Sequence, residues 1–265
     1  MLEPHGFCAG VKGALERAGR NPGAYCLHEI VHNDIVVGEL RNAGMKFVES
    51  IDEVPPNETI IFSAHGVSPA VRAEAEARGL KIVDATCPFV AKVHRDARSF
   101  ALAGLPVVVI GHAGHAEVKG IVGEVLAVEG ASAYVYPDVP EEGAGIGVVS
   151  QTTMNSDEVA RILEGLRGKF KVKTSAAVCH ATKERQDAVK NFEGDVLIVL
   201  GGANSSNTRR LAEVARCKAY RAGTMEELKA LDLSGAGHVG LTAGASTPEA
   251  FLNEAVEFLE KEQVK

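Results

Sequence analysis

The 265-residue sequence contains no tryptophan, and aromatic residues make up only 5% of it. Basic residues are not in excess, because 28 Lys and Arg stand against 35 Asp and Glu, which gives a formal net charge of −7. The lack of a basic stripe argues against a nucleic-acid partner. The scarcity of aromatic rings argues against stacking on single strands.

Long apolar segments are also missing. No apolar run approaches 18 residues, so we expect no membrane-spanning helix and no membrane partner. The first ten residues carry neither a basic segment nor an apolar core, so we expect no secretory leader and a cytoplasmic protein.

Several common motifs are absent as well. There is no Walker A sequence and no G-x-G-x-x-G fingerprint, so a bound phosphate would not be held by a lysine loop. None of the five cysteines belongs to a C-x-x-C pair, and their number is odd. This pattern argues against both a disulfide framework and a zinc finger.

What the sequence does contain is an alternation of short apolar runs with helical patterns. The runs are nearly continuous and rich in β-branched residues, which is typical of strands buried on both faces of a parallel sheet. The alternation therefore predicts an α/β fold with mainly parallel sheets. The strand candidates are residues 59–64, 106–110, 145–149, 196–200 and 238–242.

Three helix starts have clear signals. Ser68-Pro69 predicts a helix that Gly79 ends, and the segment 224–227 has the composition of a capping box. Thr247-Pro248 predicts the last helix. One face of that helix carries Phe251, Leu252, Ala255, Val256 and Leu259.

Polar loops recur in a threefold pattern. Each of Cys8, Cys87 and Cys179 is followed by a Gly-, Ser-, Thr- or His-rich stretch after 24 to 28 residues and by another after a further 33 to 41. The recurrence predicts three similar α/β units of roughly 80–90 residues. We place them at residues 1–83, 84–172 and 173–265.

The polar stretches suit an anionic ligand. In open α/β sheets, ligands bind beyond the carboxyl ends of the strands, and helix N-termini offer free N–H groups to phosphate. The segment GGANSSN (201–207) is the strongest candidate, although a simple helix cap would have a similar composition. Histidines that can donate hydrogen bonds, transfer protons or bind metal lie in the other loops, at positions 32, 65, 112 and 115.

Cys8, Cys87 and Cys179 open the three predicted units, so their thiolates could share one metal centre. Three cysteine ligands leave an open coordination position, which catalysis needs. A 4Fe–4S cluster with one iron lacking a cysteine fits this pattern, and buried inert cysteines are the alternative. Cys26 and Cys217 lie outside the pattern.

The motifs GFCAGV, HEIVHN, FSAHGVS, DATCPFVAKVH, GHAGHAEV, QTT, GGANSSN and TAGAS closely resemble those of the 4-hydroxy-3-methylbut-2-enyl diphosphate reductase family (IspH/LytB). The resemblance runs from residue 4 to about residue 260. It implies three α/β units arranged as a pseudo-threefold trefoil around one central 4Fe–4S cluster per chain. It also implies the last step of the methylerythritol phosphate (non-mevalonate) isoprenoid route, in which an allylic hydroxyl is removed reductively to give isopentenyl and dimethylallyl diphosphate.

The resemblance also implies roles for individual residues. Cys8, Cys87 and Cys179 resemble the cluster ligands. Glu117 and Thr152 resemble the proton-delivery pair, with His115 beside them. The diphosphate contacts implied are His32, His65, His115, Thr152, Ser205, Ser206, Asn207 and Ser246.

The implied chemistry has a physical basis. The open iron would act as a Lewis acid on the substrate hydroxyl, and Glu117 would be the general acid that turns hydroxide into water. A ferredoxin or a flavodoxin would supply the electrons. Compared with the family pattern, the segment between Cys8 and His32 is short, and His5 stands where arginine is common. We expect these departures to affect the packing of the first unit rather than the site.

Two other classes fit the residues less fully. A Cys/His hydrolase or transferase would use Cys8 or Cys179 as its nucleophile and contain no iron. A structural zinc or iron–sulfur module would bind metal only to engage a partner. Iron content after anaerobic purification separates the three.

Overall fold

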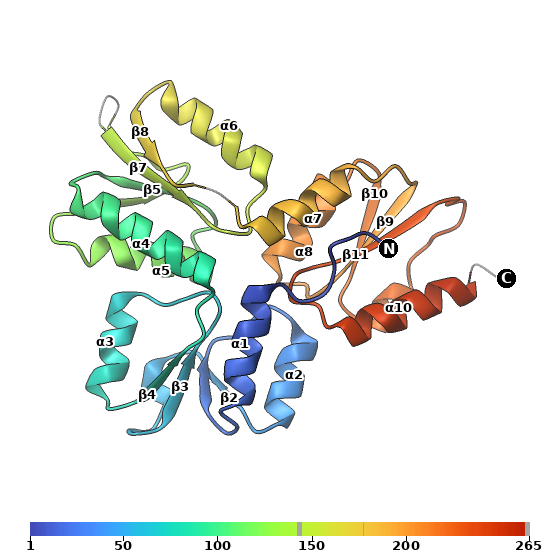
Figure 1. Cartoon of the computed structure of the whole chain (residues 1–265), viewed down its shortest axis with the longest axis horizontal. Coiled ribbons are helices and arrows are strands. Elements are labelled where there is room, and N and C mark those ends of the chain that lie inside the picture. The colour runs from blue at the N-terminus through green and yellow to red at the C-terminus, as the bar shows by residue number, and fades with distance from the viewer. Residues whose placement is uncertain (142–144, 177, 263–265) are drawn as a thin grey trace. The chain divides into compact units, whose positions relative to one another are not determined.

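A computed structural model describes residues 1–141, 145–176 and 178–262 (Figure 1). Within the described residues the strands form three separate sheets, and every pair of neighbouring strands is parallel. The predicted fold class, α/β with small parallel sheets, is therefore confirmed. The predicted second and third units include residues 142–144, 177 and 263–265, which lie outside the described residues.

The first sheet has the strand order β2-β1-β3-β4. Its strands are β1 (Tyr25–Leu27), β2 (Lys46–Val48), β3 (Thr59–Phe62) and β4 (Lys81–Asp84). The helices of this part of the chain are α1 (Ala9–Gly19), α2 (Asp34–Asn42), the 3-10 turn η1 (Ile51–Glu53) and α3 (Pro69–Ala77).

The second sheet repeats this order as β6-β5-β7-β8. Its strands are β5 (Val107–Ile110), β6 (Ala133–Val135), β7 (Gly145–Ser150) and β8 (Lys171–Thr174). Its helices are α4 (Pro88–Leu102), α5 (Ala116–Leu126) and α6 (Ser156–Arg167).

The third sheet has the order β10-β9-β11, which matches the first three positions of the other two. Its strands are β9 (Val196–Leu200), β10 (Lys218–Ala222) and β11 (Val239–Ala243). Its helices are α7 (His180–Lys190), α8 (Ser206–Val214), α9 (Met225–Lys229) and α10 (Glu249–Glu262). Where the other sheets have a fourth strand beside the third, here the N–H of Leu2 donates to the carbonyl of Leu241 in β11 at 2.8 Å.

The chain forms two compact units. The terminal unit comprises residues 1–12, 31–39 and 180–265, and the central unit comprises residues 13–30 and 40–179. The third sheet belongs to the terminal unit, and the first two sheets belong to the central unit. The division into three units at the predicted boundaries stays a prediction.

Both faces of the second sheet are covered by helices, which explains its continuous apolar strands. Val107 and Val109 of β5 lie in a core with residues of α4 and α5, whereas Val108 and Ile110 lie in another with residues of α6. All four side chains are fully buried. Successive residues of a strand point to opposite faces, so an uninterrupted apolar run is required when both faces are covered.

Local sequence signals account for most helix ends. Ser68 caps α3 by accepting from the N–H of Val71 at 3.3 Å, and Gly79 follows the helix with a φ of +68°. Thr224 caps α9 by accepting from the N–H of Glu227. In a capping box the Glu227 carboxylate would accept from the N–H of Thr224. Here it accepts from the N–H of Gly223, one residue earlier.

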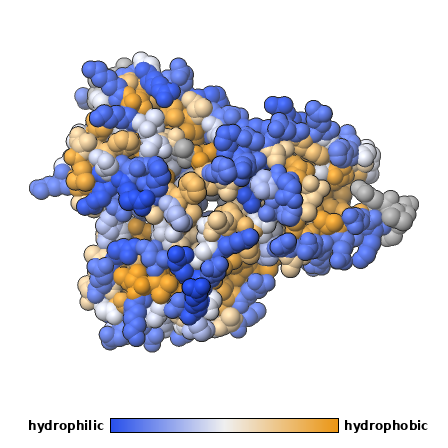
Figure 2. Space-filling model, in the orientation of Figure 1, coloured by the Kyte–Doolittle hydropathy of each residue, from blue (hydrophilic) through white to orange (hydrophobic). Residues whose placement is uncertain are grey.

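Hydrophilic residues cover much of the face shown in Figure 2 and surround smaller apolar areas. None of the helices in the described part of the chain combines the length and apolar character that a bilayer crossing requires.

Candidate functional site

Three cysteines occupy equivalent positions in the fold. Cys8, Cys87 and Cys179 each stand immediately before a helix, α1, α4 and α7 respectively. The N–H of each donates to the carbonyl two residues beyond the third strand of a sheet. Those acceptors are Ala245 at 3.2 Å for Cys8, Ala64 at 3.1 Å for Cys87 and Thr152 at 3.0 Å for Cys179.

The repeated hydrogen bond ties each cysteine to a polar loop that the sequence singled out. Each cysteine stands at a helix N-terminus, where backbone N–H groups without a partner inside the helix can donate to a sulfur atom. Cys8 shows such a bond, since its Sγ accepts from the N–H of Val11 at 3.5 Å. Each of the three thiols is half-buried and outside any disulfide.

The other two cysteines have different surroundings. Cys26 is fully buried in β1, and burial raises the pKa of its thiol to about 12. It therefore stays protonated and behaves as a small apolar residue. Cys217 stands before strand β10 rather than before a helix. The structure thus distinguishes the same three cysteines that the repeat distinguishes.

In the central unit, two predicted histidines lie together. The rings of His65 and His115 meet edge to face with centroids 5.5 Å apart. His115 is also the N-cap of α5, because its Nδ1 accepts from the N–H of Glu117 at 3.2 Å. In the neutral form this bond assigns the ring proton to Nε2, which makes Nε2 the donor atom of the ring.

Glu117 and Thr152 are the second predicted group in the central unit. The Glu117 carboxylate accepts from the N–H of Thr152 at 2.7 Å and from its hydroxyl at 3.1 Å. Glu117 is 1% exposed. Burial raises its pKa to about 7, although the two bonds from Thr152 act in the opposite direction. A carboxyl group with this pKa can hold a proton at neutral pH and release it.

Thr152 also connects this acid to a cysteine. Its N–H donates to Glu117, and its carbonyl accepts from the N–H of Cys179. The next residue back, Gln151, was missed by the sequence reasoning although it lies inside the QTT motif. Its fully buried amide accepts from the N–H of His112 and donates to the Thr153 hydroxyl, so it fixes the loops around Thr152.

In the terminal unit, the GGANSSN segment forms the start of α8. Ser205 is a true N-cap, since its hydroxyl accepts from the N–H of Thr208 at 3.2 Å. The hydroxyl proton of Ser205 remains available as a donor. Asn207 is 6% exposed, and neither its Oδ1 nor its Nδ2 has a hydrogen-bond partner. A buried amide without a partner costs stability unless a ligand satisfies it.

Two more predicted residues of the terminal unit approach this segment. The hydroxyl of Ser246 donates to the carbonyl of His32 at 3.3 Å. A Cβ added to Gly202 would lie 3.0 Å from that same carbonyl oxygen. Gly202 therefore permits the GGANSSN loop to approach His32 closely, which a larger residue would prevent.

The predicted site residues fall into two groups. The terminal unit holds Cys8, His32, Ser205, Ser206, Asn207 and Ser246, and the central unit holds His65, Cys87, His115, Glu117, Thr152 and Cys179. Within the described residues, no three His, Cys, Asp or Glu side chains gather closely enough to hold a metal ion by themselves. The roles of these residues stay predictions.

Parallel α/β sheets with helix N-termini and neutral donors at the carboxyl ends of their strands define a class of enzymes that bind anionic ligands. Within this class, the model of the LytB protein family matches residues 1–260, and the chain belongs to that family.

Curated relatives cover almost the whole chain. One from Pseudomonas entomophila (strain L48), named 4-hydroxy-3-methylbut-2-enyl diphosphate reductase, is 42% identical over 279 residues, which are 98% of this chain and 89% of the relative. A reductase of the same name from Hahella chejuensis (strain KCTC 2396) is also 42% identical and covers 98% of this chain and 88% of its own length.

Solved structures agree with this assignment. The E-1-hydroxy-2-methyl-but-2-enyl-4-diphosphate reductase from Plasmodium falciparum matches with a TM-score of 0.89 at 31% identity, over 97% of this chain and 86% of its own. A structure of (E)-4-hydroxy-3-methyl-but-2-enyl diphosphate reductase, described as the terminal enzyme of the non-mevalonate pathway, matches with a TM-score of 0.70 at 32% identity over 98% of both chains. The predicted family is confirmed.

Proposed function

We propose that the chain reduces 4-hydroxy-3-methylbut-2-enyl diphosphate to isopentenyl and dimethylallyl diphosphate, the last step of the non-mevalonate isoprenoid pathway. Like its relatives, the chain is an oxidoreductase. The net reaction takes up two electrons and two protons, breaks the allylic C–O bond and releases water. The observation that carries the proposal is the protonatable Glu117, which shares Thr152 with Cys179.

Cys8, Cys87 and Cys179 would hold one 4Fe–4S cluster. Their chemistry fits the group, because all three are half-buried thiols at helix N-termini, and cysteine sulfur is the ligand that iron–sulfur clusters require. Three ligands leave one iron without a cysteine. When bound, such a cluster supplies electrons and an open iron position for the substrate oxygen.

Neutral donors would bind the diphosphate. Ser205, Ser206 and Asn207 lie at the start of α8, where the helix dipole favours negative charge. The unpartnered amide of Asn207 would gain the hydrogen bonds that it lacks. The remaining contacts would come from His32, His65, His115, Thr152 and Ser246. Charged phosphate oxygens make these hydrogen bonds stronger than bonds between neutral groups.

Glu117 would deliver the proton that turns the departing hydroxide into water. Its elevated pKa keeps a useful fraction protonated near neutral pH. The Thr152 hydroxyl, 3.1 Å from Oε2, can accept that proton while donating its own onward. The backbone N–H of Thr152 holds Oε1 in place, so Oε2, which faces the Thr152 hydroxyl, would carry the proton that is transferred.

A ferredoxin or a flavodoxin of the cytoplasm would supply the electrons. Reduced one-electron carriers suit a cluster that accepts electrons singly.

The test is iron content and absorption after anaerobic purification of the full chain. We expect a brown protein with broad absorption near 400 nm and about four Fe per chain, as one 4Fe–4S cluster requires. Cys8→Ser, Cys87→Ser and Cys179→Ser should each lose iron, because a hard oxygen replaces a soft thiolate poorly. Cys26→Ser and Cys217→Ser are matched controls that should keep it.

Two other outcomes would contradict the proposal. A colourless protein with one zinc would indicate a structural module, and a protein with neither metal would indicate cysteine-based hydrolysis or transfer.

A further inference from the structure

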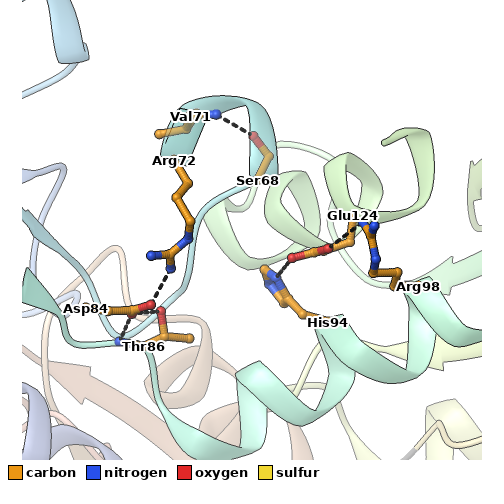
Figure 3. Close-up of polar contacts among 8 residues, drawn as sticks. All are labelled: Ser68, Val71, Arg72, Asp84, Thr86, His94, Arg98 and Glu124. Carbon is orange, nitrogen blue, oxygen red and sulfur yellow. Dashed lines mark hydrogen bonds and ion pairs between the residues drawn. The ribbon is translucent and has the colours of Figure 1, made fainter. Parts of the chain in front are cut away.

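His94 lies in the interior of the central unit and takes no part in the chemistry described above. It sits in the middle of α4, seven residues after Cys87, and its side chain is 8% exposed. Its Nδ1 lies 3.4 Å from a carboxylate oxygen of Glu124 on α5 (Figure 3). Arg98, one turn further along α4, lies 3.7 Å from the other Glu124 oxygen. Glu124 is therefore held between two side chains of one helix face.

The other edge of the His94 ring contacts two glycines from different elements. A Cβ added to Gly66 would lie 3.1 Å from both Cε1 and Nε2 of His94. A Cβ added to Gly120 would lie 2.8 Å from Cε1 and 3.0 Å from Nε2. Real Cβ atoms essentially never approach within 3.0 Å, so the ring occupies the space that a side chain on Gly120 would need.

These contacts place the ring where three functional segments meet. Gly66 directly follows His65, and Gly120 lies on α5 behind its first turn, which carries His115 and Glu117. The helix that carries His94 begins directly after Cys87. Thr86, the residue before Cys87, contributes a methyl group 3.2 Å from the Gly66 Cβ position. Thr86 and His94 thus enclose Gly66.

The surroundings of the ring select one tautomer of the neutral form. A proton on Nδ1 can be donated to Glu124, whereas Nε2 is buried with no hydrogen-bond partner. A proton on Nε2 would be a buried donor without an acceptor, which costs more than a buried lone pair. Of the two tautomers of the neutral ring, the one with its proton on Nδ1 is therefore the one that the site favours, and Glu124 fixes the orientation of the ring.

We propose that His94 is a positioning residue that sets the spacing between the loop carrying His65 and the helix carrying His115 and Glu117, with Glu124 holding its ring in place. The expected effect on diphosphate binding rests on the proposed function, whereas the effect of His94 on the spacing of the two segments does not. The contact between the rings of His65 and His115 is the geometric feature that the spacing determines. Both histidines can donate to the diphosphate only if the two segments keep their separation.

The experiment compares His94→Ala, Gly120→Ala and the double variant in the anaerobically purified full chain. We expect each single variant to weaken binding of the diphosphate substrate by at least about 10-fold in calorimetry, the lower limit for losing one hydrogen bond to a charged group. In the double variant the added methyl group enters the space left by the ring, so affinity should recover by at least threefold. Single-turnover rates at saturating substrate should change by less than threefold, because Glu117 keeps its partners.

Glu124 provides a conservative pair. Glu124→Gln keeps an acceptor for Nδ1 of His94 and should bind the diphosphate substrate with wild-type affinity. Glu124→Ala removes that acceptor and should weaken substrate binding as His94→Ala does. Val125→Ala is the control for general loss of packing, because Val125 is fully buried in the same α4–α5 core. It should lower the melting temperature as much as His94→Ala does while leaving substrate affinity unchanged.

A readout without substrate separates this proposal from the proposed function. In histidine-labelled protein, His94→Ala should shift the imidazole NMR signals of both His65 and His115, and Val125→Ala should not. If wild type fails to bind the diphosphate but these shifts appear, the proposed function fails and the positioning role stands. If the signals stay in place, or if His94→Ala binds substrate like the wild type, the proposal is wrong.

Discussion

Glu117→Gln separates proton delivery from binding most cleanly. Glutamine keeps the size of the side chain and an oxygen that can accept from the N–H of Thr152, but it carries no titratable proton. Loss of a general acid typically costs 10²–10⁴ in rate, so turnover should fall at least ~100-fold. Iron content and substrate affinity should persist, because none of the proposed cluster ligands changes and the Thr152 bond can remain.

The same substitution has a measurable effect on stability. Burial raises the pKa of Glu117 from 4.5 to about 7, so the folded state holds this proton over a pH range where the unfolded state has lost it. Folding stability therefore falls as pH rises from 4.5 to about 7. At 1.36 kcal/mol per pKa unit, the loss from this group is about 3 kcal/mol. Glu117→Gln should lack this decline.

Two assays test both consequences. The first is anaerobic steady-state reduction with a chemical electron donor at saturating substrate, measured between pH 6 and 8.5. Wild-type turnover should decline as pH rises through about 7, where Glu117 loses its proton. The second is urea unfolding of wild type and variant between pH 5 and 8. Turnover of Glu117→Gln within threefold of wild type would contradict a role for Glu117 in proton delivery. An equal dependence of unfolding free energy on pH in the two proteins would contradict the raised pKa of Glu117.

Three further predictions follow from other parts of the molecule. Ser205→Ala and Asn207→Ala each remove a hydrogen-bond donor to the charged diphosphate, so each should weaken substrate binding by about 1.5–3 kcal/mol, or roughly 10- to 150-fold in affinity. If calorimetry shows unchanged substrate binding in both variants, the segment 201–207 is only a helix cap. Asp84 accepts hydrogen bonds from the N–H and the hydroxyl of Thr86, the residue before Cys87 (Figure 3). Asp84→Asn should therefore accelerate iron loss in the presence of a chelator and lower the free energy of unfolding by about 1 kcal/mol. Iron loss at the wild-type rate would show that Asp84 does not help to hold Cys87 in place. Burial acts to raise the pKa of Asp84, but its bonds to Thr86 and Arg72 outweigh this and lower it. The contribution of Asp84 to the free energy of unfolding is therefore lost only as pH falls below 3.8. If wild type and Asp84→Asn unfold in acid with the same midpoint, this contribution is absent.

Much of the fold could be predicted because buried parallel strands leave a strong signal. The five predicted runs correspond to β3, β5, β7, β9 and β11, which are central or heavily buried strands. Short strands such as Tyr25–Leu27 and Lys46–Val48 were not among the candidates, because three residues are too few to show a period. Their place is determined by pairing with neighbouring strands.

The site was predictable from its residue types but not from its connections. The polar loops and the three cysteines stand out in the sequence because they recur. The hydrogen bond from Cys8 to Ala245 joins opposite ends of the chain, and no local pattern encodes it. The elevated pKa of Glu117 depends on complete burial, which its place beside a polar loop does not reveal. The pairing of His94 with Glu124 depends on how α4 packs against α5.

We expect this chain to reduce an allylic diphosphate. The most direct measurement is product formation from 4-hydroxy-3-methylbut-2-enyl diphosphate by the anaerobically purified full chain, supplied with a reduced viologen dye as electron donor. We expect isopentenyl and dimethylallyl diphosphate as products, with two electrons consumed per product molecule and no turnover by Cys179→Ser. A protein that carries its full iron content and still forms neither product would contradict it.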